Sequence, residues 1–94
     1  VVIEKFENFN QAIFSINESQ YGLQAGIFTD SISEMNQSLN EIEVGGVIIN
    51  DVPTFRVDHM PYGGVKNSGF GREGVKYAIH EMMEPRLMVK NTDY

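Results

Sequence analysis

Apolar residues in the first half of the chain occur either in short continuous runs or at the spacing of one helical face. The first such face comprises Phe9, Ala12, Ile13 and Ile16. Their i, i+3, i+4, i+7 spacing predicts a helix. Asn8 lies just before this set, and Gln11 three residues later completes a capping-box pattern. A capped amphipathic helix is therefore expected directly after residue 8.

A second helix is predicted from about residue 31. Its apolar stripe is Ile32, Met35, Leu39 and Ile42. Asp30 or Ser31 is the expected cap, and Ser31 with Glu34 repeats the capping-box pattern. Gly45 and Gly46 follow the stripe, and glycine commonly ends a helix.

Three apolar runs alternate with these helices and read as strands. They cover residues 1–3, 23–29 and 47–49. The third is a continuous β-branched run, which is typical of a strand covered on both faces. The order strand, helix, strand, helix, strand predicts a βαβαβ unit and hence the α/β fold class.

The pattern changes after residue 50. From Asn50 to Gly71 there is little periodicity, two prolines and several glycines. A loop of this length in a compact domain is usually functional or disordered, and its polar and aromatic residues favour a function. Ser68, near its end, is the expected cap of a third helix.

The third helical face comprises Val75, Ala78, Ile79 and Met82. This helix must end by Glu84, because the residue before a proline avoids the helical conformation. Residues 86–90 then alternate as a last strand, and residues 91–94 form a polar tail.

Composition narrows the classes of function. The 94 residues suit one small domain or a piece of a larger one. Seven Lys and Arg against 13 Asp and Glu give a net charge of −6, which disfavours nucleic acid and anionic membranes as partners. No apolar run approaches the roughly 20 residues of a membrane span. The absence of cysteine excludes disulfides and a cysteine nucleophile carried by this chain, and it fits a cytoplasmic location.

Two short motifs resemble known sites but have simpler explanations. Residues 69–74 are a literal G-x-G-x-x-G, yet a dinucleotide fingerprint needs a strand immediately before it and an acidic residue about 20 positions later. A tight turn leading into a helix is preferred. His80 and Glu81 begin like the zinc motif H-E-x-x-H, but the second histidine is missing, so no metal site is expected.

Two arginines in the loop are candidates for anion binding. The planar fork of arginine can bind a carboxylate or phosphate. The alternative for Arg56 is an ion pair with Asp51, Asp58 or Glu73, and the two interpretations have equal weight. For Arg72 a structural role is favoured.

Residues 61–74, P-Y-G-G-V-K-N-S-G-F-G-R-E-G, resemble the C-terminal signature of the NAD(P)-dependent aldehyde dehydrogenase superfamily. Residues 21–29, Y-G-L-Q-A-G-I-F-T, and 45–50, G-G-V-I-I-N, are similar to two further motifs of that family. Residues 1–17 resemble the stretch that follows the family's E-x-F-G-P motif. These segments occur in the family's order and cover nearly the whole chain.

The resemblance implies that the chain is the C-terminal part of an aldehyde dehydrogenase. Residues 1–85 would belong to its catalytic domain, and residues 86–94 would be an oligomerisation strand and tail, so a homo-oligomer is expected. In this family a cysteine thiolate attacks the aldehyde and hydride passes to NAD or NADP. Water activated by a glutamate then hydrolyses the thioester. The cysteine, this glutamate and the cofactor domain all lie upstream of the matched region. The chain alone is therefore expected to be inactive and to bind no cofactor.

The resemblance also implies roles for individual residues. Glu73 matches the glutamate that relays protons from the deacylating water, and Lys66 matches a lysine that shapes the loop. The expected substrate contacts in the entrance loop are Asp51, Phe55, Arg56, His59 and Tyr62. Phe55 and Tyr62 would be apolar walls. Residues 54–58 are similar to the branch that acts on small polar or anionic aldehydes, where Arg56 with His59 would hold the anionic end.

One alternative belongs to a different class of protein. The chain could instead be a stand-alone, non-catalytic α/β remnant that self-associates through its last strand, because an unpaired strand edge recruits partners.

Overall fold

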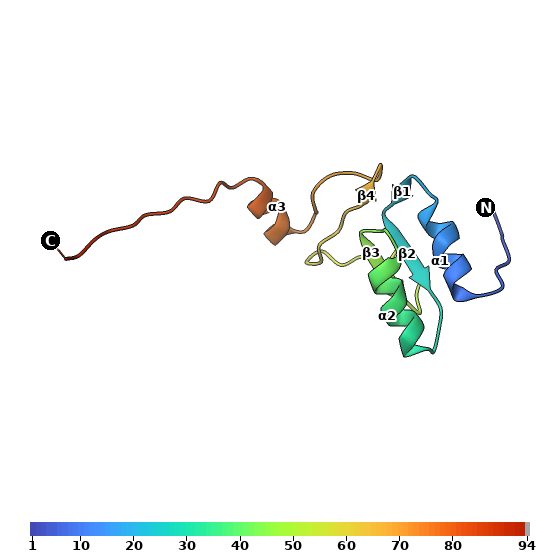
Figure 1. The fold of residues 1–94 in the computed structure, drawn as a ribbon. Helices are drawn as coiled ribbons and strands as arrows, with labels where there is room; N and C mark the ends of the chain where they lie inside the picture. The colour runs from blue at the N-terminus through green and yellow to red at the C-terminus, as the bar shows by residue number, and fades with distance from the viewer. Residues whose placement is uncertain (94) are drawn as a thin grey trace.

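Three helices and four short strands succeed one another in the computed structural model, which describes residues 1–93 (Figure 1). In chain order they are α1 (Phe9–Asn17), β1 (Tyr21–Gly22), β2 (Gln24–Ile27), α2 (Ile32–Glu41), β3 (Gly46–Ile49), β4 (Val65–Lys66) and α3 (Val75–Glu81). The last residue of the predicted tail, Tyr94, lies outside the described residues. The mixture of helices and strands places the chain in the α/β class, as expected.

Both predicted helix caps form. The Asn8 side chain accepts a hydrogen bond from the backbone N–H of Gln11 at 3.0 Å. Ser31, rather than the residue before it, caps α2 by accepting from the N–H of Glu34 at 3.3 Å. These bonds satisfy donors that a helix start otherwise leaves without partners. The starts of α1 and α2 are therefore fixed by local sequence.

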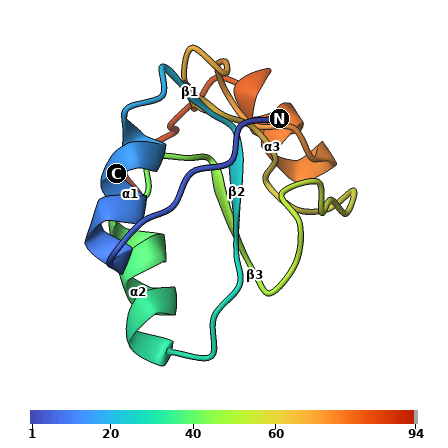
Figure 2. The same cartoon turned by 90° about the vertical axis from the view of Figure 1, so that its right-hand side faces the viewer.

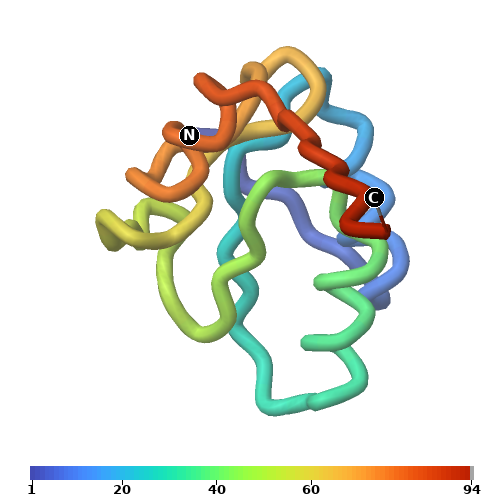
Figure 3. Tube along the Cα trace, turned by 90° about the vertical axis from the view of Figure 1, so that its left-hand side faces the viewer, coloured from blue at the N-terminus to red at the C-terminus, as the bar shows by residue number. Residues whose placement is uncertain are grey.

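The central feature of the fold is a parallel pair of strands joined through α2. β2 and β3 pair from Gln24 opposite Gly46 to Ile27 opposite Ile49. Helices α1 and α2 lie together on one side of this pair, and α3 with the long loop lies on the other (Figures 2 and 3). The core between helices and strands is formed by Ile13, Ala25, Ile27 and Ile42. One βαβ unit is thus confirmed.

Two predicted strands are absent from the described residues. Residues 1–3 form no strand and are exposed, so the expected βαβαβ unit is reduced to a single βαβ. Residues 86–90 are also exposed and pair with no strand of residues 1–93. A strand needs a neighbour for its N–H and C=O groups, and neither segment has one among the described residues. An apolar run alone therefore did not suffice to form a strand.

The predicted apolar stripe of the second helix is wrong in part. Ile42 is buried, but Ile32 and Leu39 are exposed. Ser38 is fully buried instead, and its hydroxyl donates to the carbonyl oxygen of Glu34 at 2.7 Å. A small polar residue can face the strands because its hydroxyl is satisfied within the helix. β3 is half-buried along its length rather than covered on both faces.

Lys66 attaches the long loop to the corner between α1 and β1. Its Nζ donates to the carbonyl oxygens of Asn17 at 2.7 Å and Ser19 at 3.0 Å. The same ammonium lies 2.7 Å from Oε2 of Glu43. The antiparallel pair of β1 and β4 forms at this place. This geometry gives Lys66 the loop-shaping position that the resemblance implied.

The start of α3 differs from the expectation. Ser68 does not cap it, because its Oγ accepts from the N–H of Gly22 at 2.9 Å. The residue before α3 is Gly74, which makes no side-chain cap. The helix ends at Glu81, before Glu84 as predicted. Beyond it the chain runs away from the body (Figure 1), and this tail contributes to the elongated dimensions of 71 × 26 × 23 Å.

Candidate functional site

Arg56 is the centre of the polar cluster that the long loop forms. Its Nη2 lies 2.9 Å from Oε2 of Glu73. Its Cζ lies 4.9 Å from the centroid of the Tyr62 ring, within the range of a cation–π interaction. The structure therefore brings together three of the six predicted site residues. Among the acidic partners that the sequence left open for Arg56, the structure selects Glu73.

Tyr62 and Glu73 are joined by their backbones as well as through Arg56. The N–H of Tyr62 donates to the carbonyl oxygen of Glu73 at 3.2 Å. In return, the N–H of Glu73 donates to the carbonyl oxygen of Tyr62 at 2.6 Å. This reciprocal pair is an isolated antiparallel bridge. It holds the two residues side by side although they lie 11 positions apart in the sequence.

Gln24 anchors the residues just before Arg56. From β2, its Nε2 donates to the carbonyl oxygens of Pro53 and Phe55, each at 3.0 Å. The loop also packs closely on this strand, since a Cβ added to Gly26 would lie 2.6 Å from the carbonyl oxygen of Asp51. The loop backbone is thus held by the βαβ unit. Periodicity alone did not indicate Gln24, which occupies a strand position with no marked pattern.

The other predicted substrate residues lie apart from this cluster. Asp51 Oδ1 accepts from the N–H of Val52 at 2.7 Å and so shapes its own turn. The side chain of Phe55 is partly exposed beside Arg56. His59 is on the loop but borders a separate hollow of about 590 Å³ next to α3. The structure does not bring Asp51 or His59 to the Arg56–Glu73 pair by any hydrogen bond among the described residues.

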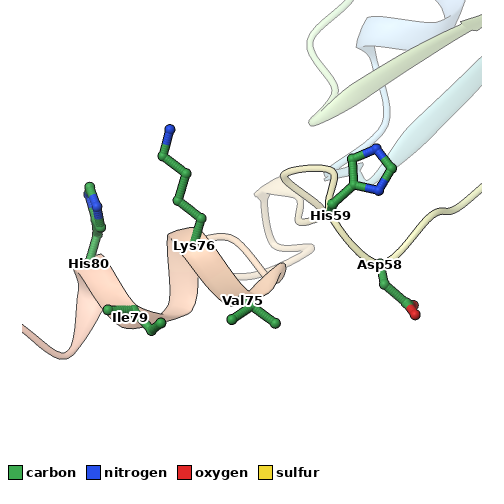
Figure 4. A pocket seen from close by; sticks show the side chains of 6 residues that line it. All are labelled: Asp58, His59, Val75, Lys76, Ile79 and His80. Carbon is green, nitrogen blue, oxygen red and sulfur yellow. The ribbon is translucent and has the colours of Figure 1, made fainter.

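Figure 4 shows the hollow next to α3 and the side chains around it. Its lining residues are Asp58, His59, Val75, Lys76, Ile79 and His80. His59 comes from the loop, whereas Lys76 and His80 project from α3 on the side opposite to Val75 and Ile79. The two histidines do not form a metal site, because residues 1–93 hold no group of three side chains suited to bind a metal.

A different hollow borders the cluster itself. It measures about 550 Å³ and is lined in part by Tyr62, Gly64, Ser68, Arg72 and Glu73. The Nη1 group of Arg72 is already engaged within the chain. It donates to the carbonyl oxygens of Gly64 at 3.1 Å and Gly71 at 2.7 Å. This bonding agrees with the structural role favoured for Arg72. The cluster therefore offers one open guanidinium, that of Arg56. Its partners Tyr62 and Glu73 border this hollow, whereas Arg56 itself does not.

The glycines at 69, 71 and 74 do not fit a dinucleotide. All three have positive φ values, of 133°, 65° and 101°, but the preceding strand β4 is two residues long and pairs antiparallel. A Cβ built on Gly71 would lie 3.7 Å from Oε1 of Glu81. The Glu81 carboxylate therefore lies next to this turn, and its negative charge disfavours a pyrophosphate there. The segment is a glycine turn that leads into α3, as the sequence indicated.

The arrangement can bind an anion and hold a carboxylate near it. A guanidinium has five N–H donors, and the one hydrogen bond of the Arg56 side chain among the described residues goes to Glu73. The remaining donors can take a carboxylate, phosphate or sulfonate. Fold and site together define an α/β segment whose loop carries an exposed arginine paired with Glu73. No helix within residues 1–93 has the length and apolar character to cross a membrane.

Comparison with known proteins assigns this segment to a family. Residues 1–88 match the aldehyde dehydrogenase family, so the chain belongs to it. A 3-sulfolactaldehyde dehydrogenase from Priestia aryabhattai is 53% identical over 91 residues, which are 97% of this chain and 19% of that protein. The chain therefore spans about a fifth of the length of this relative.

Solved structures give the same result. Aldehyde dehydrogenase 21 from Physcomitrella patens, in complex with the reaction product succinate, superposes with a TM-score of 0.88 at 46% identity and covers 94% of this chain and 18% of its own. A glyceraldehyde-3-phosphate dehydrogenase from Methanocaldococcus jannaschii, complexed with NADP, gives a TM-score of 0.75 at 51% identity, with 78% and 16% covered. The likeness therefore holds for both sequence and fold.

Proposed function

We propose that this chain is the C-terminal segment of an NAD(P)-dependent aldehyde dehydrogenase that oxidises a small anionic aldehyde to a carboxylic acid. The position within the enzyme rests on the signature at residues 61–74, which resembles the family's C-terminal motif. Residues 1–85 would complete the catalytic domain. Residues 86–94 would form an oligomerisation strand and tail. The cytoplasmic location stays a prediction.

The reaction converts aldehyde, water and NAD(P)⁺ into carboxylate, NAD(P)H and two protons. The cofactor supplies the hydride acceptor. Because the chain contains no cysteine and its glycine turn does not fit a dinucleotide, the thiolate and the cofactor site would come from the rest of the enzyme. The 94 residues alone would then be inactive.

Two roles in this reaction fall to residues of the chain. The long loop would form the substrate entrance, with Phe55 and Tyr62 as its apolar groups and Asp51 and His59 nearer its edges. Glu73 would relay to solvent the proton released when water attacks the acyl intermediate. Its carboxylate suits this role because it is 65% exposed in the structure of this chain and so can be reached by water.

The observation that carries the anionic substrate is the exposed guanidinium of Arg56, which is 48% accessible. Its two partners, Tyr62 and Glu73, both border a hollow. The descriptions of the three relatives above mention 3-sulfolactaldehyde, succinate and glyceraldehyde 3-phosphate. These compounds carry a sulfonate, two carboxylates and a phosphate. Each of these anions matches the planar fork of arginine. An anionic aldehyde is therefore the substrate class that the cluster supports best.

The test uses the complete enzyme that carries this segment. Succinic semialdehyde and butanal have similar carbon chains and differ in their charged end. Replacement Arg56→Met should lower kcat/KM for succinic semialdehyde by about 10- to 100-fold, since hydrogen bonds to charged groups contribute about 1.5–3 kcal/mol. The value for butanal should not fall. Equal losses for both aldehydes would contradict recognition of the anionic end.

A second measurement addresses the oligomer. Leu87, Met88 and Val89 are more than four-fifths exposed in the single chain, which favours a partner for this segment. Truncation of the complete enzyme after Glu84 should reduce the number of subunits in its oligomer, as measured by analytical ultracentrifugation. An unchanged oligomer would contradict the proposed role of residues 86–94.

A further inference from the structure

Glu73 is held by the same guanidinium that would bind the anionic end of a substrate. Its Oε2 lies 2.9 Å from Nη2 of Arg56, which is the distance of a charge-assisted hydrogen bond. A glutamate side chain presents the same carboxylate group as a substrate such as a semialdehyde acid. In this structure, therefore, a carboxylate of the protein occupies the site at which a substrate carboxylate would bind.

We propose that Glu73 fills the anion site of Arg56 until an anionic substrate displaces it, and that this displacement frees Glu73 for the proton relay. The inference rests on the proposed function and adds a coupling between recognition and chemistry. An aldehyde without a charged end would leave Glu73 bound to Arg56. The enzyme would then discriminate against it in the deacylation step as well as in binding.

The exchange is feasible because the ion pair is exposed and singly bonded. The Arg56 and Glu73 side chains are 48% and 65% accessible, and exposed pairs of this kind contribute little net stability. One hydrogen bond connects the two side chains. A substrate carboxylate that approached the fork with both oxygens would form two parallel bonds, so it could replace Glu73.

Tyr62 keeps the guanidinium in place during the exchange. Its ring lies 4.9 Å below Cζ of Arg56, and this contact does not depend on Glu73 carrying a hydrogen bond. Gln24 holds the backbone on the other side through the carbonyl oxygens of Pro53 and Phe55. The backbone of Glu73 is fixed by its two bonds to Tyr62. The Glu73 side chain is therefore the part that moves, and Tyr62 is a positioning residue for Arg56.

The experiment measures deacylation in the complete enzyme by single-turnover kinetics. With butanal, Arg56→Met should raise the deacylation rate about two- to fivefold, because Glu73 is no longer held by an exposed ion pair. In the wild type, deacylation should be faster with succinic semialdehyde than with butanal. In Arg56→Met this difference between the two aldehydes should disappear. A butanal rate that stays constant or falls in Arg56→Met would overturn the inference. Lys5→Met, which removes an exposed cation from the segment before α1, is the control and should leave both rates unchanged.

A second measurement starts from the wild-type enzyme. Acetate added to the wild-type enzyme should speed the turnover of acetaldehyde about two- to fivefold, because the free anion fills the Arg56 site while the short neutral aldehyde reacts. The effect should disappear in Arg56→Met. Absence of activation at any acetate concentration in the wild type would contradict the inference.

The role of Tyr62 has its own readout. Tyr62→Leu keeps an apolar side chain at the entrance but removes the ring, so it should raise KM for succinic semialdehyde more than KM for butanal. Tyr62→Phe should retain the wild-type values because its ring still faces the cation. Equal changes for both aldehydes would reduce Tyr62 to a structural residue.

Failure of the inference and failure of the proposed function give different results. If Arg56→Met lowers kcat/KM for succinic semialdehyde selectively but does not raise the butanal rate, the anion site stands and the displacement of Glu73 is wrong. If the variant treats both aldehydes alike, the anionic substrate itself is wrong.

Discussion

Residues 8–49 and residues 50–93 are held together by different forces. The first region contains the whole buried core, formed by Ile13, Ala25, Ile27 and Ile42. The second contributes no residue to that core, and its segments are fixed by hydrogen bonds, ion pairs and close glycine contacts. Burial stabilises the scaffold, and polar contacts position the loop that carries the site.

The difference separates stability from function within one small chain. A residue in the core acts on the fold through the free energy of unfolding. A residue in the loop can be changed without loss of apolar burial, so its effect should appear in substrate recognition. Loops that bind ligands on a rigid scaffold commonly show this division. The predictions below test it at four positions.

The largest effect is expected in the core. Ile13 on α1 is 5% exposed, whereas Leu39 on α2 is 70% exposed. Ile13→Ala should lower the free energy of unfolding of the 94-residue chain by about 2–5 kcal/mol, through lost burial and the cavity that remains. Leu39→Ala, the matched control, should change it by no more than about 0.5 kcal/mol. Urea denaturation followed by circular dichroism measures both, and equal effects would deny that the core lies where the structure places it.

The next largest effect is expected where the two regions touch. A Cβ on Gly45 would collide with the carbonyl oxygen of Gly63. The N–H of Gly45 also donates to the carbonyl oxygen of Gly22 at 3.1 Å. Gly45→Ala should lower the free energy of unfolding by about 1–3 kcal/mol, as overpacking does. The same denaturation experiment checks this value. A neutral substitution would show that the loop does not pack against the scaffold at this point.

A smaller effect is expected at Lys66, which attaches the loop to α1 by polar contacts. Lys66→Met removes the two hydrogen bonds to Asn17 and Ser19 and the ion pair with Glu43. The cost should be about 1–2 kcal/mol, below the range for fully buried charged hydrogen bonds because the site is partly exposed. Hydrogen exchange should show faster amide exchange at Asn67, whose N–H bonds to the carbonyl of Gln20. Unchanged exchange there would argue against an attachment at this corner.

The smallest effect on stability is expected at the centre of the site. Arg56→Met removes an exposed ion pair and should change the free energy of unfolding by about 0–1 kcal/mol. The same substitution should have the large effect on anionic substrates described above. If it unfolded the chain instead, the division between scaffold and loop would be wrong. Thermal unfolding of the variant beside the wild type decides between these outcomes.

Part of the fold could be predicted because its causes are local. The caps at Asn8 and Ser31 depend on residues three positions apart, and the parallel pair of β2 and β3 follows from a strand–helix–strand order. The strands expected at residues 1–3 and 86–90 do not form within residues 1–93, and the reason is not local. A strand requires a neighbour, and residues 1–93 provide none for either segment.

In the candidate site, too, the sequence indicated some residues but not their partners. The residue types in the loop indicated Arg56, Tyr62 and Glu73, but the sequence left three acidic partners open for Arg56. Gln24 gave no signal at all. Its contribution depends on the distance between its amide and two loop carbonyls, and no periodicity carries that information.

The sequence by itself therefore determined the helices α1 and α2 with their caps, the βαβ unit, the loop and the motifs of the aldehyde dehydrogenase family. Only the tertiary structure decided that Glu73 holds Arg56, that Gln24 fixes the loop and that Lys66 attaches it to α1. These contacts join residues 17, 29 and 49 positions apart. Local sequence specifies backbone conformation and which faces are apolar. The partner of a polar side chain is set by how distant segments pack, because a hydrogen bond requires its two groups to meet within about 3 Å.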